Sequence, residues 1–358
     1  MKSIITRVQF FLIAVCGAMF ADSVQANTPP IDLINVVWGR EYTDLFLDWA
    51  LPLQLCPRNL GCLSADSVRY RVFTTKGDWE YMQAHPSMMK LKEMVKVDFV
   101  EISYPNSGEH RYNKMHQCHD QAIADARQIG AALIFLAPDL LLSNQCFETI
   151  LKKVEQGYRA VLFNTLDLRE NALDSMGKIL RDETIQKNGI SPRDLLGLGM
   201  QYCHPSHLGI FVNGQTNCFS CGLFWKLDDL NNMIIHVWGA HTIYIWPENY
   251  SLYNGVDNSL ALYACPNQDT WVMIQDSDEM AGWNAAGIKG LEDRYPRDTY
   301  FDPASVANWA KRNVIDAQQL YIFARPLYLH STGHKEEWGK IEKEESEFIL
   351  KVLEQYQH

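Results

Sequence analysis

One short apolar run, at positions 132–136, constrains the fold of this chain more than any other segment. A helical pattern precedes it and ends at Gly130, and another follows it and ends at Gly157. An apolar run between two helices is typical of a central strand in a parallel sheet, where both faces are buried. The run leads into Pro138-Asp139, and ligands of such sheets bind at the carboxyl ends of the strands. Asp139 is therefore a candidate binding residue, although Pro-Asp can also simply begin a turn.

Strand-like and helical segments alternate along the first half of the chain, which predicts an α/β fold with a mostly parallel sheet flanked by helices. From His334 the chain is rich in Lys and Glu, and an apolar stripe there predicts an amphipathic C-terminal helix. Because no repeat or linker interrupts the chain, we expect one domain with an elaborated second half. The expected strands are 31–37, 70–75, 97–102, 132–136 and 159–163, with strand-like pieces at 242–246 and 270–274.

The first 26 residues have the parts of a secretory signal peptide. Lys2 and Arg7 precede an apolar stretch, and Val24-Gln25-Ala26 fits a small-x-small cleavage site. We therefore predict that residues 1–26 are removed and that the protein is exported, to the periplasm or outside the cell. An uncleaved anchor and a cytoplasmic protein are the alternatives. Beyond this segment, no run reaches the ~20 apolar residues that a membrane span needs.

Without Cys16, eight of the nine cysteines would remain, an even number that fits an oxidising compartment. Cys56 and Cys62 flank a short loop, so they are the pair for which a disulfide is easiest to expect. Cys118 and Cys146 lie in helical patterns, where buried free thiols are the alternative.

Charge and motifs exclude several functional classes. The formal net charge of −11 argues against a nucleic-acid binder, because phosphate contacts need clustered Lys and Arg. The sequence also lacks a phosphate-binding P-loop, a dinucleotide-binding glycine pattern and a nucleophile elbow. We therefore do not expect a P-loop protein, a Rossmann dehydrogenase or a serine hydrolase.

Carboxylates follow two of the apolar runs. A single one, Asp139, could hold Mg²⁺ or Mn²⁺ at a strand end. Three more, Asp276, Asp278 and Glu279, come directly after the apolar piece that ends at 274. Clustered carboxylates repel one another unless a cation or proton compensates, so metal binding and general-base chemistry are the functional interpretations. A solvated acidic turn is the alternative.

A histidine pair and a cysteine pair lie close together in the second half. His204 and His207 precede Cys218 and Cys221, and four such ligands could hold zinc. The cysteines could equally form a disulfide or remain buried thiols, and the histidine spacing is tighter than usual, so we do not expect zinc. His241 lies in an aromatic setting, where a core or surface histidine is the simpler interpretation.

Taken in order, several segments resemble a bacterial family of glycosyltransferases with a nucleotide-diphospho-sugar transferase (GT-A-like) fold. The resemblance covers about residues 31–328. Its landmarks are Val37-Trp38-Gly39, 42–47, Leu51-Pro52, Asn59-Leu60, 70–75, 135–139, Ser143-Asn144, 157–161, 191–195, His204-Pro205, Phe224-Trp225, His241, Trp246-Pro247 and 276–279.

The resemblance implies a nucleotide-binding half at 31–165 and an acceptor half at 166–330, within one domain at 27–330 that a C-terminal helix at 331–358 follows. It also implies Mn²⁺ or Mg²⁺ on an Asp-x-Asp motif at a central strand end. Here Asp139 stands alone, because Ala137 occupies the partner position. Asp257 keeps one acid of a second acidic run of the family.

The resemblance further implies site roles. Trp38, Gly39, Thr74 and Thr75 would border the nucleotide, with His204 also in the donor site. Asp139 would contact the diphosphate or its metal, and His241 would complete the metal shell. One of Asp276, Asp278 and Glu279 would accept the proton of the acceptor hydroxyl.

The implied activity is sugar transfer from a nucleotide-sugar donor to a glycan, lipid or protein acceptor. Nucleotide sugars are cytosolic, which conflicts with the predicted export. The alternatives are therefore an exported, non-catalytic protein that binds glycans or a partner, and a metal-dependent hydrolase.

Overall fold

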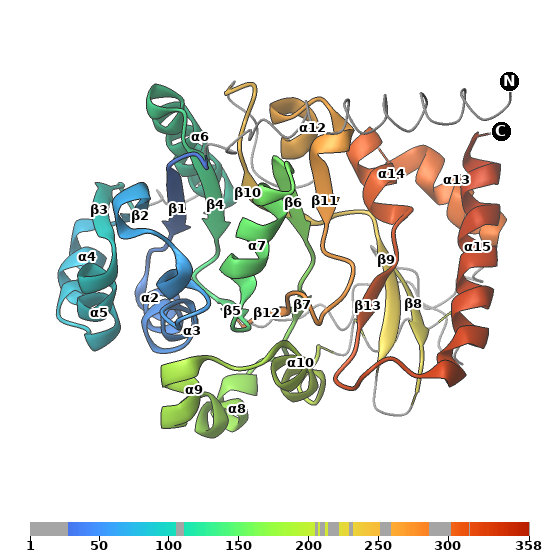
Figure 1. Cartoon of the computed structure of the whole chain (residues 1–358), viewed down its shortest axis with the longest axis horizontal. Coiled ribbons are helices and arrows are strands. Elements are labelled where there is room, and N and C mark those ends of the chain that lie inside the picture. The colour runs from blue at the N-terminus through green and yellow to red at the C-terminus, as the bar shows by residue number, and fades with distance from the viewer. Residues whose placement is uncertain are drawn as a thin grey trace, which may run out of the picture.

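The computed structural model describes residues 28–104, 111–204, 207, 212–213, 222–228, 232–250, 259–285, 302–314 and 316–357. A seven-stranded sheet runs through it in the order β11-β6-β10-β4-β1-β2-β3 (Figure 1). Every strand except β10 runs in the same direction, because β10 pairs antiparallel with both β4 and β6. The strands are β1 (Ile31–Val36), β2 (Val68–Thr74), β3 (Lys96–Glu101), β4 (Ala132–Leu136), β6 (Ala160–Phe163), β10 (His241–Ile245) and β11 (Trp271–Met273).

Burial explains why these segments form strands. β1 and β4 are buried at every residue, as expected for central strands between two helical layers, whereas the edge strand β3 is partly exposed. β1 also carries the buried Asp32, and its carboxylate accepts two hydrogen bonds from Arg69 on the neighbouring strand β2 (2.9 and 2.6 Å). Pairing of this kind is what allows a charged side chain inside a sheet.

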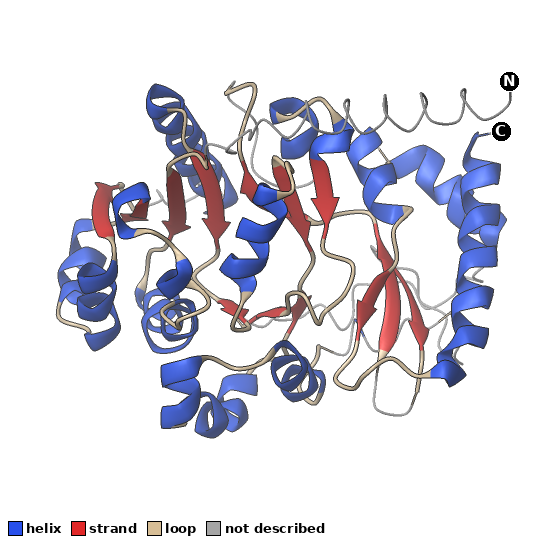
Figure 2. Cartoon of the chain, in the orientation of Figure 1, coloured by secondary structure: helices blue, strands red, loops and turns tan. Residues whose placement is uncertain are grey.

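Helices cover both faces of the sheet (Figure 2). One apolar core includes side chains of α6, α8, α10 and α12, and a second core includes side chains of α3, α5 and α7. The helices of this region are α2 (Arg40–Leu45), α3 (Leu51–Gln54), α4 (Lys76–Gln83), α5 (Pro86–Met94), α6 (Arg111–Ile129), α7 (Cys146–Glu155), α8 (Ala172–Leu180), α9 (Glu183–Asn188), α10 (Pro192–Met200) and α12 (Leu260–Ala264).

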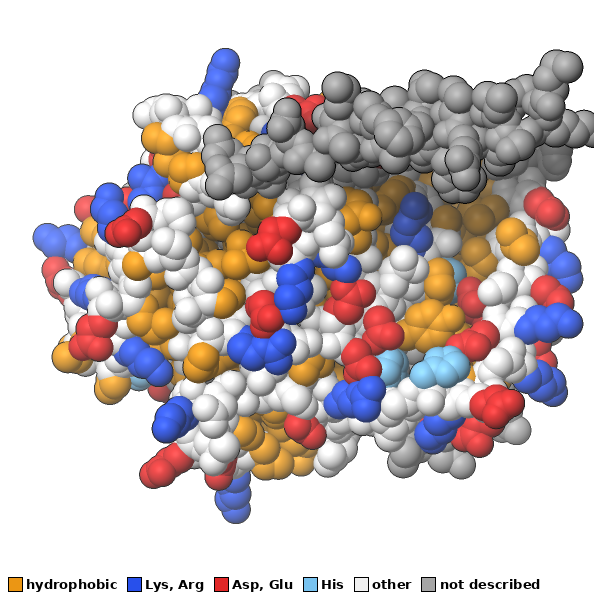
Figure 3. All heavy atoms as spheres, viewed as in Figure 1, with side chains coloured by type: hydrophobic (Ala, Val, Ile, Leu, Met, Phe, Trp, Pro, Cys, Tyr) orange, Lys and Arg blue, Asp and Glu red, His pale blue; other side chains and the backbone are white. Residues whose placement is uncertain are grey.

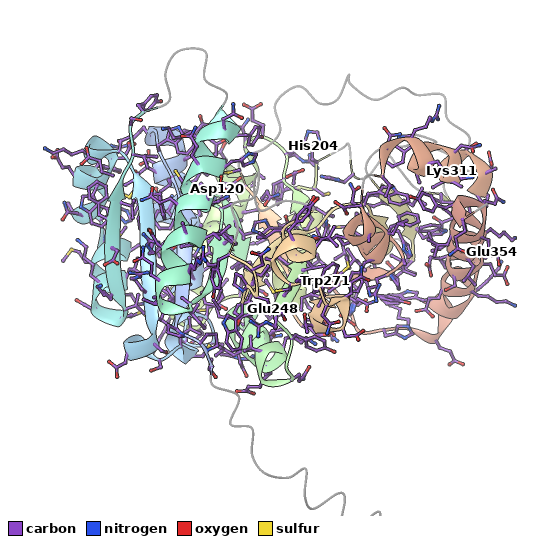
Figure 4. The ribbon with its side chains drawn as sticks, turned by 90° about the horizontal axis from the view of Figure 1, so that it is seen from above. Asp120, His204, Glu248, Trp271, Lys311 and Glu354 are labelled. Carbon is purple, nitrogen blue, oxygen red and sulfur yellow. The ribbon has the colours of Figure 1, made fainter. Side chains whose placement is uncertain are left out.

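Two smaller sheets extend the molecule, in the orders β5-β12-β7 and β13-β9-β8. Their strands are β5 (Leu140–Leu142), β7 (Leu166–Asp167), β8 (Gly222–Lys226), β9 (Met233–Val237), β12 (Gly282–Asn284) and β13 (Leu327–Leu329). The helices α13 (Pro303–Asn313), α14 (Ala317–Phe323) and α15 (Gly339–Gln357) pack on the second of these sheets around a third, aromatic core. In Figure 4, Lys311 and Glu354 lie on the opposite side of the molecule from Asp120, with Trp271 of β11 between them.

The predicted fold class is confirmed: the protein is α/β, with a mostly parallel sheet flanked by helices. The predicted amphipathic C-terminal helix is present as α15, whose buried residues include Ile349 and Val352. The charged region after Asp167 forms two helices, α8 and α9. The large sheet takes β10 and β11 from the second half of the chain, so both predicted halves contribute strands to it.

The expected Cys56–Cys62 disulfide is wrong. Both residues are free thiols, as are the other cysteines of the described ranges, Cys118, Cys146, Cys203 and Cys265. The loop between Cys56 and Cys62 folds into turns, and the Cys62 thiol lies 3.0 Å from the Asn59 carbonyl, to which it donates. Burial raises the pKa of the Cys62 thiol to about 11, which keeps it protonated near neutral pH.

In the part of the chain that the structure covers, no helix is long and apolar enough to cross a membrane. The predicted signal peptide at 1–26, Cys218, Cys221 and Asp257 lie outside the described residues.

A close contact under β12 gives a test of the packing. A Cβ on Gly199 of α10 would lie 2.1 Å from a ring carbon of Trp283, which is wholly buried. We expect Gly199→Ala to lower the free energy of unfolding by about 1–3 kcal/mol, because overpacking forces the ring out of place. Gly77→Ala is the control, since a Cβ there meets nothing within 4 Å, and it should be neutral or slightly stabilising. Equal urea midpoints for the two variants would contradict this packing.

Candidate functional site

The carboxyl ends of β1 and β2 bring four predicted donor-binding residues together. Trp38 and Gly39 follow β1, Thr74 ends β2, and Thr75 caps α4. The Oδ2 atom of Asp78 accepts hydrogen bonds from the Gly39 backbone N–H (2.9 Å) and the Thr75 hydroxyl (2.8 Å). Gly39 has φ of +80°, a conformation that suits glycine. Thr74 is wholly buried, whereas Trp38, Gly39, Thr75 and Asp78 are half-buried and form the accessible part of this β1–β2 corner.

Asp139 and His241 both lie at the same edge of the sheet. Asp139 is half-buried in a turn between β4 and β5, and its backbone carbonyl accepts a hydrogen bond from Ala285 (2.9 Å). His241 begins β10, which runs antiparallel to β4, so its position is also at the carboxyl ends of the parallel strands. The His241 Nε2–H donates to the Phe135 carbonyl (3.1 Å).

His204 and His207 lie beside Asp167 at the end of β7. The buried His204 donates its backbone N–H to the Asp167 carbonyl (2.8 Å), and His207 Nε2 lies 3.0 Å from the Asp167 carboxylate. Asn284 donates to the other carboxylate oxygen (3.0 Å). Burial alone would raise the pKa of Asp167, but the hydrogen bonds from His207 and Asn284 hold it below its usual value.

The acidic turn follows β11, and a histidine from a distant segment completes it. Asp276 forms a parallel bridge with Tyr328 of β13, which brings His330, two residues further on, beside the turn. The Nε2 atom of His330 lies 3.0 Å from Asp276 Oδ1, and Nδ1 lies 2.5 Å from the Thr332 carbonyl. The His330 side chain is only 3% exposed, whereas that of Asp276 is 46% exposed.

The Asp276–His330 contact shifts the pKa values of both groups. Burial would lower the pKa of His330, but the Asp276 carboxylate and the Thr332 carbonyl raise it above its usual value. Burial would raise the pKa of Asp276, but His330 and the backbone N–H of Asp278 lower it. Both shifts favour the ion pair, in which His330 is protonated and Asp276 is charged.

The other two acids of the turn, Asp278 and Glu279, are each paired with a basic side chain. Asp278 accepts two hydrogen bonds from Arg193 of α10, at 2.7 Å from Nε and 2.6 Å from Nη2. Glu279 forms an ion pair with Lys153 of α7. Gln145, the residue before α7, also holds the backbone of the turn, because its side-chain amide donates to the carbonyls of Asp278 (2.7 Å) and Glu279 (3.2 Å).

Asp276 also lines a small pocket beyond the carboxyl ends of β6 and β11. Its polar wall includes Asn164, Gln275 and Ser277, and its apolar wall includes Trp283 and Tyr328. In Figure 3, acidic, basic and histidine side chains gather on the viewed face between the positions of α10 and β13 in Figure 1.

Asp276, Asp278 and His330 form a possible site for a divalent metal ion. Of the residues described, they are the one group of three potential ligands whose atoms all lie within 4.8 Å of one another. Histidines that bind metals usually donate their other ring N–H to a carbonyl or carboxylate, and His330 Nδ1 does so to Thr332. The donor set therefore fits a divalent ion once Nε2 is unprotonated and Arg193 leaves Asp278. The Asp-x-Asp spacing that is absent at Asp139 is present here, after the edge strand β11.

No protein-family model and no curated protein matches this chain. Among solved structures, a Bacillus anthracis protein assigned as a glucose-1-phosphate thymidylyltransferase is 11% identical, with TM-score 0.25 over 40% of this chain and 56% of its own. Mouse xyloside xylosyltransferase 1 is 11% identical, with TM-score 0.26 over 42% and 59%. The 4-diphosphocytidyl-2C-methyl-D-erythritol synthase of Anaerococcus prevotii is 10% identical, with TM-score 0.25 over 42% and 63%. The chain spans less than two thirds of each of these structures, and its function has to be inferred from its own residues.

His330 and Arg193 are the site residues that the sequence did not point to. Arg193 is recognisable as part of a helix start at Ser191-Pro192, but nothing local indicates its partner. His330 follows a short strand. The acids lie 52 to 54 residues before it in the sequence, so no short metal-ligand motif links them to His330. Asp78 had a local signal, because a threonine cap with an acid three residues later is typical of a helix start.

Proposed function

We propose that the protein is a glycosyltransferase that moves a sugar from a nucleotide-sugar donor to an acceptor hydroxyl. In this proposal Asp276, Asp278 and His330 hold Mn²⁺ or Mg²⁺ beside the donor diphosphate. The observation that carries the proposal is the orientation of the buried His330, whose Nδ1 is committed to a carbonyl while Nε2 faces a carboxylate of an Asp-x-Asp pair. Such an ion, when bound, neutralises the charge that develops on the leaving diphosphate.

The order of the strands supports a donor path along the edge. β11 lies four strand spacings from β1, which is roughly 19 Å at the usual spacing of neighbouring strands. A donor that reaches both the β1–β2 corner and the acidic turn must cross the ends of β4 and β10, where Asp139 and His241 lie. We therefore assign the nucleoside to Trp38, Gly39 and Thr75, and the middle of the donor to Asp139 and His241.

The chemistry needs one proton acceptor. As the acceptor oxygen bonds to the anomeric carbon, the bond from that carbon to the donor phosphate breaks and the hydroxyl proton must leave. Asp276 and Asp278 serve the ion in this proposal, so Glu279 is the carboxylate of the turn that can take the proton. Its carboxylate is held by the ion pair with Lys153 of α7, which positions it at the turn.

We expect Glu279→Gln to lower the rate of sugar transfer by about 10²- to 10⁴-fold, the usual contribution of a positioned base. Mn²⁺ binding should be unchanged, because Glu279 is not one of the three ion ligands. The assay measures Mn²⁺-dependent release of nucleoside diphosphate from a panel of nucleotide sugars with glycan acceptors. Glu155→Gln, at an exposed position on α7, is the control. A Glu279→Gln variant with full activity would remove Glu279 from the reaction.

A metal-dependent hydrolase is the second candidate, because the same Asp-Asp-His group could activate a water molecule. The two functions differ in their products. A hydrolase releases free sugar or phosphate at the same rate with and without an acceptor, whereas a transferase produces a glycosylated acceptor.

A further inference from the structure

Arg193 is the cation that neutralises Asp278. Its guanidinium makes two parallel hydrogen bonds to the two carboxylate oxygens, at 2.7 and 2.6 Å. The same two-pronged geometry serves arginine equally well on a phosphate group. A cation would therefore compete with Arg193 for the Asp278 carboxylate, and a phosphate would compete with Asp278 for the Arg193 guanidinium.

The Arg193–Asp278 ion pair is exposed, whereas the neighbouring His330 side chain is buried. The side chains of Arg193 and Asp278 are 48% and 36% exposed, whereas that of His330 is 3% exposed. Exposed pairs contribute little to stability and open at low cost in free energy. Opening the Arg193–Asp278 pair is therefore the rearrangement with the lowest cost in free energy in this cluster, while His330 stays fixed.

The backbone that carries Arg193 is firmly held. It lies in the first turn of α10, where the Ser191 hydroxyl accepts from the Asp194 N–H (3.2 Å). The buried Leu195 carbonyl accepts from the indole of Trp283 (3.2 Å), which ties this turn to β12. The guanidinium passes over Gly333, where a Cβ would lie 3.6 Å from Nη1. The side chain can thus change partner without movement of the helix.

We propose that Arg193 is a displaceable counter-ion of the metal group. It holds Asp278 when no cation is bound and releases it when a divalent ion binds Asp276, Asp278 and His330. The freed guanidinium then binds a phosphate of the donor, a step that rests on the proposed transferase function. The positive charge of Arg193 would oppose the ion while both face Asp278, and this repulsion disappears once Arg193 pairs with phosphate.

The test is calorimetric titration of the full chain with Mn²⁺ alone and then with a nucleoside diphosphate at saturating Mn²⁺. Arg193→Gln should bind Mn²⁺ about three- to tenfold more tightly, because the ion no longer competes with an exposed ion pair. The same variant should bind the diphosphate about tenfold more weakly, because a charged two-pronged contact is lost. Opposite changes in the two affinities are the signature of a counter-ion that changes partner.

Two further variants show whether the affinity changes come from the Arg193–Asp278 pair. Arg58→Gln is the matched control, since Arg58 is also 48% exposed and paired with a carboxylate, Glu148, away from the turn. It should leave both affinities unchanged. In an Asp278→Asn background, Arg193→Gln should no longer tighten Mn²⁺ binding, because the shared partner is gone.

Equal or weaker Mn²⁺ binding by Arg193→Gln would overturn the counter-ion role, and so would a wild-type protein that binds no Mn²⁺. Unchanged diphosphate affinity would overturn the transfer of Arg193 to phosphate. If Mn²⁺ binding tightens as expected but no protein binds any nucleoside diphosphate, the transferase function fails while the role of Arg193 at the metal group stands.

Discussion

Replacing Asp276 with asparagine is expected to weaken Mn²⁺ binding by more than about a hundredfold and to abolish sugar transfer. Mutation of groups that only orient a metal ligand typically costs 10- to 100-fold in affinity or activity, so loss of a ligand should exceed that range. Asp276 carries one of the two carboxylate charges of the group and lies directly against His330 (3.0 Å). Calorimetry with Mn²⁺ and the transfer assay measure the two effects in the same preparation.

The matched control is Asp269→Asn, which removes an exposed carboxylate just before β11 and should change neither quantity. Circular dichroism should show that both variants are folded, because Asp276 is half-exposed and its loss removes no buried apolar contact. An Asp276→Asn protein with wild-type Mn²⁺ affinity would remove Asp276 from the metal group.

The second large effect concerns stability rather than chemistry. Glu345 of α15 and His236 of β9 form a buried pair, 2.5 Å apart, with side chains 3% and 1% exposed. His236 Nδ1 donates to the Phe323 carbonyl at the end of α14 (2.6 Å). Glu345→Ala should lower the free energy of unfolding by about 3–5 kcal/mol, because removal of one partner leaves a buried polar group unsatisfied.

Urea denaturation measures this loss against two comparisons. Glu344→Ala, which removes an exposed partner of Lys340, should cost less than about 0.5 kcal/mol. Glu345→Gln should lie between the two, because an amide can still donate to the His236 ring nitrogen. A Glu345→Ala variant no less stable than Glu344→Ala would show that this pair does not hold α15 on the sheet.

The sheet was predictable from the sequence because its signals are local. The run at 132–136 lies between two helices, and a buried parallel strand needs nothing more specific than apolar residues at that place. The Pro138-Asp139 turn was also local, and the structure confirms both its turn geometry and its place at the carboxyl edge. The direction of β10 had no such signal, because strand direction depends on which neighbours a strand meets.

The acidic turn was only half predictable. The acids at 276, 278 and 279 stand out because repulsion among them requires compensation, but the compensating groups are far away in sequence. His330 arrives through the Asp276–Tyr328 bridge and Arg193 through the packing of α10 under β12. The Cys56–Cys62 expectation failed for a similar reason, since spacing alone does not show that the Cys62 thiol turns toward the Asn59 carbonyl.

A thermal-shift screen of nucleoside diphosphates and nucleotide sugars, each with and without Mn²⁺, tests the proposed donor site most directly. We expect at least one nucleoside diphosphate to raise the melting temperature of the wild-type protein only when Mn²⁺ is present. The shift should disappear in Asp278→Asn and persist in Asp269→Asn. A screen in which no nucleotide shifts the wild-type protein, or in which Asp278→Asn responds as the wild type does, would contradict a metal-dependent donor site at the acidic turn.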